Sequence, residues 1–74
     1  MPKIHGILLA SSGNRLEIGR AGGIAECLTT REHDVAKEYA GMQGHQVWVI
    51  LDMMKGSAHV VVAKVYLKER VADP

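Results

Sequence analysis

The residues of this chain that could do chemistry are scattered rather than clustered. Its 74 residues include four histidines and one cysteine, Cys27. Cys27 and His33 flank an expected junction between a strand and a helix, so their side chains could approach each other. A Cys–His nucleophile also needs a group that orients the base and donors that stabilise an oxyanion. The sequence identifies neither, and a buried core cysteine near a solvated histidine is the simpler interpretation.

Three other patterns that could mark an active site also have simpler explanations. The histidines show neither a helical i, i+4 pair nor a Cys/His cluster with zinc spacing. The stretch GRAGG at 19–23 lacks the spacing of a P-loop or a dinucleotide site, and it fits a loop with positive φ. Glu32, Asp34 and Glu38 fit the solvated face of a helix. We therefore expect a protein that is not an enzyme and that uses no metal and no cofactor.

The composition is that of a small globular domain. Hydrophobic residues make up 47% of the chain and charged residues 23%, and the formal net charge is only +1. This charge gives no strong field for a polyanion. The single cysteine favours a reducing compartment, and the N-terminal apolar run is too short for a signal peptide or a membrane span. These features predict a cytoplasmic protein with no membrane partner.

Five short apolar runs have the character of β-strands. In Arg15–Arg20, Leu16 and Ile18 face one way and Arg15 and Glu17 the other, which is typical of a half-buried strand. This strand can form a hairpin with the run before it. A Lys-Gly-Ser turn divides the very apolar stretch Val47–Leu67 into the last two strands. We expect residues 3–68 to form a single domain and 69–74 a polar tail. The expected strands are 3–10, 15–20, 24–28 and the two halves of 47–67.

The hydrophobic period changes between the third and the fourth strand. Thr29, followed three residues later by Glu32, predicts a capping box, and an apolar stripe predicts a helix over Thr30–Ala40. One helix between the third and fourth of five strands is the order of the OB-fold barrel, a mainly β fold. If Ile24–Leu28 joins the helix instead, the chain becomes a ββαββ α+β sandwich with an open four-stranded sheet.

In an OB-like barrel, three cations of this chain would gather near the usual ligand face. Such barrels bind oligonucleotides across strands two and three, between the first and last hairpin loops. Arg15 on the second strand, Arg20 after it and Lys55 in the last hairpin turn could contact phosphates there. Single-strand binders usually stack bases on aromatic rings, and strands two and three carry none, because Trp48 and Tyr66 lie outside them. The sequence thus predicts weak, phosphate-directed binding of single-stranded nucleic acid.

The stretches IHGILLASSGNRLEI and MQGHQVWVILD resemble the small nucleic-acid-binding OB barrels. In the S1-type group, which includes bacterial initiation factor one, a first strand with an internal Gly turns into a second strand. A Gly-x-x-Val-x-Val strand then follows a short helix, and Gly44, Val47 and Val49 match it. The resemblance extends over most of the chain as a pattern, and it implies a β-barrel that binds nucleic acid.

The last two strands carry apolar residues on both faces, which gives a second possible function. Side chains alternate along a strand, so one face of each strand is expected to be core. The expected core residues are Val47, Val49, Leu51 and Met53 in the first strand, and Val61, Ala63, Val65 and Leu67 in the second. The opposite faces would form an outer apolar patch, and such patches usually mark interaction sites. The alternative function is therefore a protein-interaction or homo-oligomerising module, with a C2 dimer as its default form. The expected patch residues are Trp48, Ile50, Val60, Val62 and Tyr66.

Overall fold

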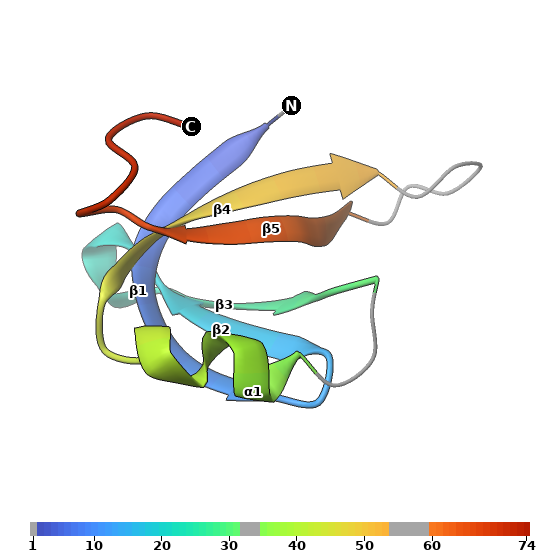
Figure 1. Ribbon diagram of the computed structural model, residues 1–74. Helices are drawn as coiled ribbons and strands as arrows, with labels where there is room; N and C mark the ends of the chain where they lie inside the picture. The colour runs from blue at the N-terminus through green and yellow to red at the C-terminus, as the bar shows by residue number, and fades with distance from the viewer. Residues whose placement is uncertain (1, 32–34, 54–59) are drawn as a thin grey trace.

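The described part of the chain is mainly β, with five antiparallel strands in one sheet and one short helix (Figure 1). This computed structural model describes residues 2–31, 35–53 and 60–74. The helix α1 (Ala36–Tyr39) lies between the third and fourth strands, as expected. The described residues also form two 3₁₀ turns, η1 (Ala21–Gly23) and η2 (Ala40–Met42). The strands are β1 (Lys3–Ser12), β2 (Arg15–Gly19), β3 (Ala25–Thr29), β4 (Gln46–Met53) and β5 (Val60–Leu67).

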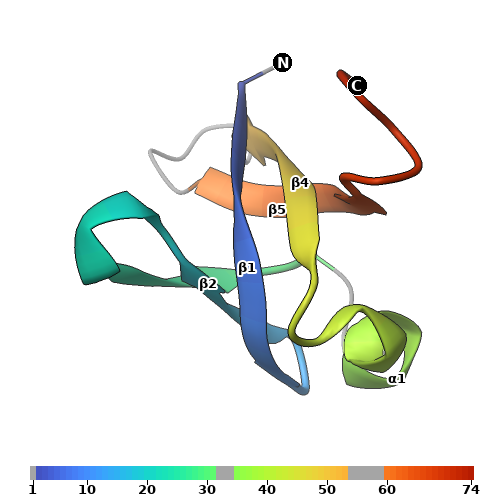
Figure 2. The same cartoon turned by 90° about the vertical axis from the view of Figure 1, so that its left-hand side faces the viewer.

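The strand order in the sheet is β3-β2-β1-β4-β5. The long strand β1 is central, and it pairs with β2 on one side and with β4 on the other (Figure 2). The register with β2 shifts between Leu8 and Ala10, and such a bulge lets a strand bend from one hairpin toward the other. The sheet is not closed into a barrel, although an isolated parallel bridge links Thr30, just after β3, to Val62 of β5.

The third strand excludes the four-stranded alternative. Ala25–Thr29 pairs with β2 along its whole length, from Ala25 opposite Gly19 to Thr29 opposite Arg15. The mainly β fold with five strands is therefore confirmed, and the ββαββ sandwich is wrong. Within the described residues, no helix is long and apolar enough to span a membrane.

The core lies between the concave inner face of the sheet and α1. Its members are aliphatic apart from Tyr39, as the absence of Phe requires. Burying one such side chain contributes about 1.5–3 kcal/mol, so a handful of them provides most of the driving force in a domain of this size. The buried cluster consists of Leu8, Leu16, Ile18, Val35, Tyr39, Val47, Val49, Val62 and Val65.

The helix begins later than the sequence predicts. Its first residue is Ala36, and Val35 stands at the N-cap position without a side-chain cap. The capping box is wrong because Thr29 completes β3, and Glu32 lies outside the described residues. The backbone N–H of Thr30 donates to the Asn14 carbonyl at 2.8 Å, which extends the strand region beyond the expected helix start.

The alternation along β5 also differs from the expectation. Ile50 lies opposite Lys64, but the next residue, Leu51, lies opposite Val62, so Ala63 is an extra residue on β5. A bulge of this kind reverses which face the following side chains occupy. Val62 is therefore buried, with 3% of its surface exposed, and the expectation that it points outward is wrong. Ala63 and Met53, both expected in the core, are exposed.

Candidate functional site

Three rings form one row across β1, β4 and β5 on the outer face of the sheet. His5 lies opposite Trp48, and Trp48 lies opposite Tyr66. The ring centroids of His5 and Trp48 are 5.3 Å apart and the planes meet at 65°, an edge-to-face arrangement that aromatic pairs favour. The row follows from the strand register, because residues opposite each other on neighbouring strands project from the same face.

Three lysines border this row. The Nζ atoms of Lys3 and Lys68 lie 5.2 Å and 5.1 Å from the centre of the Trp48 ring. The Nζ atom of Lys64 lies 5.9 Å from the centre of the Tyr66 ring. Cations within about 6 Å of an aromatic centroid are attracted by its negative face. The rings and the ammonium groups thus form one continuous surface.

A second row runs beside the rings and joins two of these lysines. Ile50 on β4 lies opposite Lys3 on β1 and opposite Lys64 on β5. Its half-buried side chain therefore lies between the two lysines in this row, and their ammonium groups lie near the rings. We call the whole surface the ring face. It consists of Lys3, His5, Trp48, Ile50, Lys64, Tyr66 and Lys68.

An open hollow continues the ring face beyond Lys68. It has a volume of about 390 Å³ and lies where β4 begins and β5 ends. Lys68 brings an ammonium group, His45 an imidazole ring and Glu69 a carboxylate to its wall. An extended ligand that crosses the ring face can therefore continue past Lys68. The hollow is lined by His45, Gln46, Lys68 and Glu69.

The expected patch and the ring face coincide only in part. Trp48, Ile50 and Tyr66 lie on the outer face as predicted, and each is half-buried. Val60 is 44% exposed at the far end of β5, and Val62 belongs to the core. The patch is therefore less apolar than the sequence predicts, because Val62 is in the core and Lys3 of β1 lies beside Ile50.

The arginines expected to bind phosphate lie elsewhere. Arg15 is exposed on β2, and its Nη2 lies 3.3 Å from the Cys27 Sγ. Arg20 follows β2 and forms an ion pair with Glu26 at 3.1 Å. Both are on the side of the sheet formed by β2 and β3, away from the ring face. Lys55 lies outside the described residues, so the proposed set Arg15, Arg20 and Lys55 stays a prediction.

The Cys–His pair gains no support. Cys27 is exposed on β3, so the expectation of a buried core cysteine is wrong. It occupies an outward position of an edge strand, opposite Glu17. His33 lies outside the described residues. In the part of the chain that the structure describes, no three His, Cys, Asp or Glu residues are grouped as potential metal ligands.

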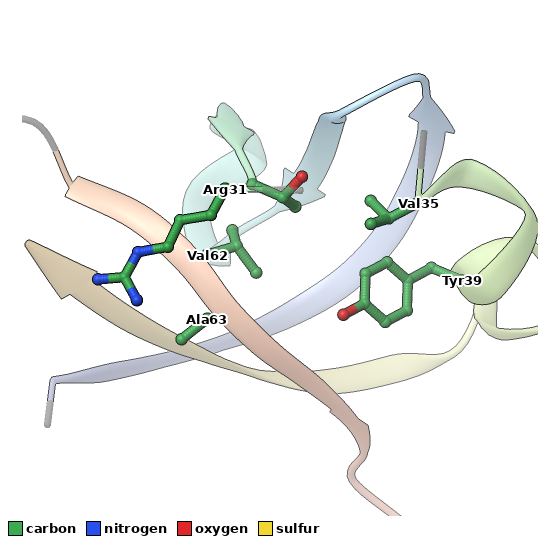
Figure 3. Close-up of a pocket in the computed structure, with 6 residues that line it drawn as sticks. Arg31, Val35, Tyr39, Val62 and Ala63 are labelled. Carbon is green, nitrogen blue, oxygen red and sulfur yellow. The ribbon is translucent and has the colours of Figure 1, made fainter. Parts of the chain in front are cut away.

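A recess near α1 has the character of packing rather than of a site (Figure 3). Its volume is about 150 Å³, and its walls are mostly core side chains. Arg31 at its rim donates a hydrogen bond to the Asp52 carboxylate, and this bond holds the pKa of Asp52 below its ordinary value of 3.8. The recess is lined by Thr30, Arg31, Val35, Tyr39, Val62 and Ala63.

The fold and the ring face define a small, mainly β domain with an aromatic surface bordered by lysines. No protein-family model, curated protein or solved structure matches this chain. A function therefore has to be argued from the chemistry of the ring face itself.

The sequence contained a signal for the lysines of the ring face. Lys64, Tyr66 and Lys68 are every second residue and alternate with others along the chain. With no bulge between them, their side chains point to the same side of the sheet. Lys3 and His5 alternate in the same way at the start of β1. These short-range patterns predict polar and aromatic residues on one face. Only the pairing of β1 with β4 brings the two groups together.

Proposed function

We propose that this protein binds single-stranded nucleic acid on the ring face. The observation that carries the proposal is the row of His5, Trp48 and Tyr66 bordered by three lysines. Proteins that bind single strands without sequence preference combine rings that stack on bases with cations that follow the phosphates. Both components are present here on one face, within contact distance of each other.

The dimensions of the face fit a short segment of a single strand. Neighbouring strands lie about 4.8 Å apart, so a row over three strands spans roughly 10 Å. The ring face can therefore stack about three bases, one on each ring, with the ligand crossing the strands. A footprint of this size, together with a net charge of +1, supports weak binding rather than a high-affinity complex.

The strand order supports an OB-like barrel of the S1-type, a fold that often binds oligonucleotides. In this proposal β3 and β5 approach each other beyond the bridge between Thr30 and Val62. The usual ligand surface of such barrels lies over the second and third strands. Arg15 and Arg20 belong to that surface, whereas the ring face lies over β1, β4 and β5. The two surfaces are separate candidates for the same ligand.

A protein-interaction or homo-oligomerising role is the second candidate. Trp48 and Tyr66 favour it, because Trp and Tyr are enriched among the residues that dominate interface energies. Lys64 and Lys68 oppose it, because lysine is depleted in the cores of protein interfaces. With Val62 turned into the core, the remaining surface is better suited to a polyanion than to an apolar partner.

The test is a titration of labelled oligonucleotides monitored by fluorescence anisotropy. Short oligothymidylate and oligouridylate are each titrated over a range of salt concentrations, with the wild type and with Lys64→Gln/Lys68→Gln. We expect saturable binding that weakens with salt. Each phosphate contact on a single strand contributes a slope of about −0.7 in log K against log salt, so the double variant should reduce the slope by about 1.4.

Two controls identify the surface. Arg15→Gln/Arg20→Gln removes the same charge from the side formed by β2 and β3, and Lys37→Gln removes one exposed charge on α1. If only Lys64→Gln/Lys68→Gln weakens oligonucleotide binding, the ring face is supported as the site. If only Arg15→Gln/Arg20→Gln weakens it, the site lies on β2 instead. Absence of binding by the wild type to both oligonucleotides at low salt would exclude the proposed function. A cytoplasmic location, in which nucleic acid is accessible and Cys27 stays reduced, fits this function.

A further inference from the structure

The segment Val71–Pro74 folds back over the ring face. After β5, the backbone N–H groups of Arg70 and Val71 both donate to the Leu67 carbonyl, at 3.0 Å and 3.1 Å, and this turn redirects the chain. The segment then runs toward the start of β1 (Figure 1). It therefore ends against the two strands that carry Lys3 and Trp48.

The segment contacts the groups that a nucleic acid would use. The indole Nε1–H of Trp48 donates to the Ala72 carbonyl at 3.1 Å. The Lys3 ammonium forms an ion pair with the Asp73 carboxylate and also donates to the Pro74 carbonyl at 3.1 Å. A carboxylate on an ammonium group occupies the place of a phosphate oxygen, and a peptide beside an indole restricts the stacking of a base on it.

These contacts are of the kind that opens readily. The side chains of Lys3 and Asp73 are 32% and 74% exposed, and exposed ion pairs are weak and easily screened by salt. Residues 72–74 are all exposed, so these three residues are held over the ring face by one ion pair and two hydrogen bonds rather than by burial. A ligand that supplies both phosphates and stacking can replace all of them.

We propose that Val71–Pro74 is an internal competitor that covers the ring face in the free protein and is displaced by nucleic acid. This inference rests on the proposed function of the ring face. The apparent dissociation constant equals the intrinsic one divided by the fraction of open protein. Contacts as weak as these leave about one sixth to one half of the molecules open, so opening the segment fully should tighten binding about two- to sixfold.

The experiment compares Asp73→Asn with Glu17→Gln in the full chain. Both variants change a carboxylate to an amide, so their net charges are equal, but Glu17 lies on β2, away from the ring face. Binding of oligothymidylate is measured by anisotropy at low salt. Acrylamide quenching of tryptophan fluorescence in the ligand-free proteins measures how far Val71–Pro74 shields Trp48, because Trp48 is the single tryptophan of the chain.

Asp73→Asn removes the ion pair and keeps the hydrogen bonds to Ala72 and Pro74. We expect it to bind more tightly than Glu17→Gln, by up to about sixfold, and its Trp48 to be quenched more readily. Suppose that the two variants show equal affinities and equal quenching, while Lys64→Gln/Lys68→Gln still weakens binding. That result would overturn the proposal that Val71–Pro74 competes with nucleic acid, and it would leave the proposed function intact. If neither the wild type nor Asp73→Asn binds the oligonucleotide, the competitor and the proposed function are both overturned.

Discussion

Trp48 of β4 and Tyr66 of β5 lie directly opposite each other on the outer face of the sheet, and each is half-buried. Directly opposite residues of an antiparallel pair have Cβ atoms about 5 Å apart, so a single flexible strand can contact both rings. Their half-burial also means that each ring is held by its neighbours before a ligand arrives. Little side-chain entropy is then lost on binding, which favours these two residues over the flexible lysines as the main source of affinity.

The rings should therefore dominate the affinity for single strands. Stacking of one base on one ring contributes about 1–3 kcal/mol, so Tyr66→Leu should weaken binding about five- to 150-fold. Tyr66→Phe is the matched control, because it keeps the ring and removes only the hydroxyl. Anisotropy titrations give the affinities and urea denaturation verifies the fold. Equal weakening by the two substitutions would mean that the hydroxyl, and not stacking, holds the ligand.

The strands were the most predictable part of the fold. Alternation in Arg15–Gly19 and in the first half of β4 correctly placed Leu16, Ile18, Val47 and Val49 in the core. In such segments every second residue is apolar and the residues between are polar or large, so the sequence indicates which side chains face the core. The run Val60–Val62 is apolar throughout, so alternation does not indicate there which side chains face the core. The bulge at Ala63 could not be predicted for that reason.

The sequence predicted the part of the ring face that lies on β4 and β5, but not how β1 joins it. Trp48, Ile50 and Tyr66 were assigned to one face because they lie in one hairpin whose pairing is local. Lys3 and His5 come from a strand more than 40 residues earlier, and their register with β4 depends on how the whole sheet assembles. The helix start failed for a related reason, because Thr30 satisfies its backbone N–H with Asn14, a partner that is distant in the sequence.

The ion pair between Arg31 and Asp52 should make stability depend on pH in the acid range. The hydrogen bond from Arg31 lowers the pKa of Asp52 in the folded state below the ordinary 3.8, so the folded protein binds fewer protons than the unfolded chain in that window. The contribution is present above pH 3.8 and is lost as the pH falls through the lowered pKa. Urea denaturation of the wild type and Arg31→Gln should therefore show a stability difference at neutral pH that shrinks below pH 3.8.

The matched control for this pair is Arg70→Gln, which removes an exposed arginine from the turn after β5. Its stability difference from the wild type should not change across the same acid window. A difference for Arg31→Gln that stays constant down to the lowest pH would show that Arg31 acts by packing and not through the Asp52 carboxylate.

Gly6 on β1 should be intolerant of any side chain. A β-carbon at this position would lie 2.5 Å from the Gly19 carbonyl oxygen and 2.7 Å from the Ile18 Cγ2. One of these obstacles is backbone, so the two strands would have to separate. Overpacking of this kind costs about 1–3 kcal/mol, and Gly6→Ala should lose that much free energy of unfolding. Gly41→Ala is the control, because a β-carbon there meets nothing within 4 Å. Equal losses in the two variants would contradict the close approach of β1 and β2.

Val60 and Val62, which lie on the same face of β5, should respond very differently to a charge. Val62 is 3% exposed and packs in the core beside the bridge to Thr30, whereas Val60 is 44% exposed two residues earlier. Val62→Lys buries an ammonium group without a partner, which should cost at least about 4 kcal/mol and unfold most of a domain this small. Val60→Lys should change the free energy of unfolding by about 0.5 kcal/mol or less. Circular dichroism with urea denaturation measures both, and light scattering of the two variants and the wild type reports their masses. A folded, monomeric Val62→Lys derived from a dimeric wild type would place Val62 in an interface, and would make the homo-oligomer the leading function.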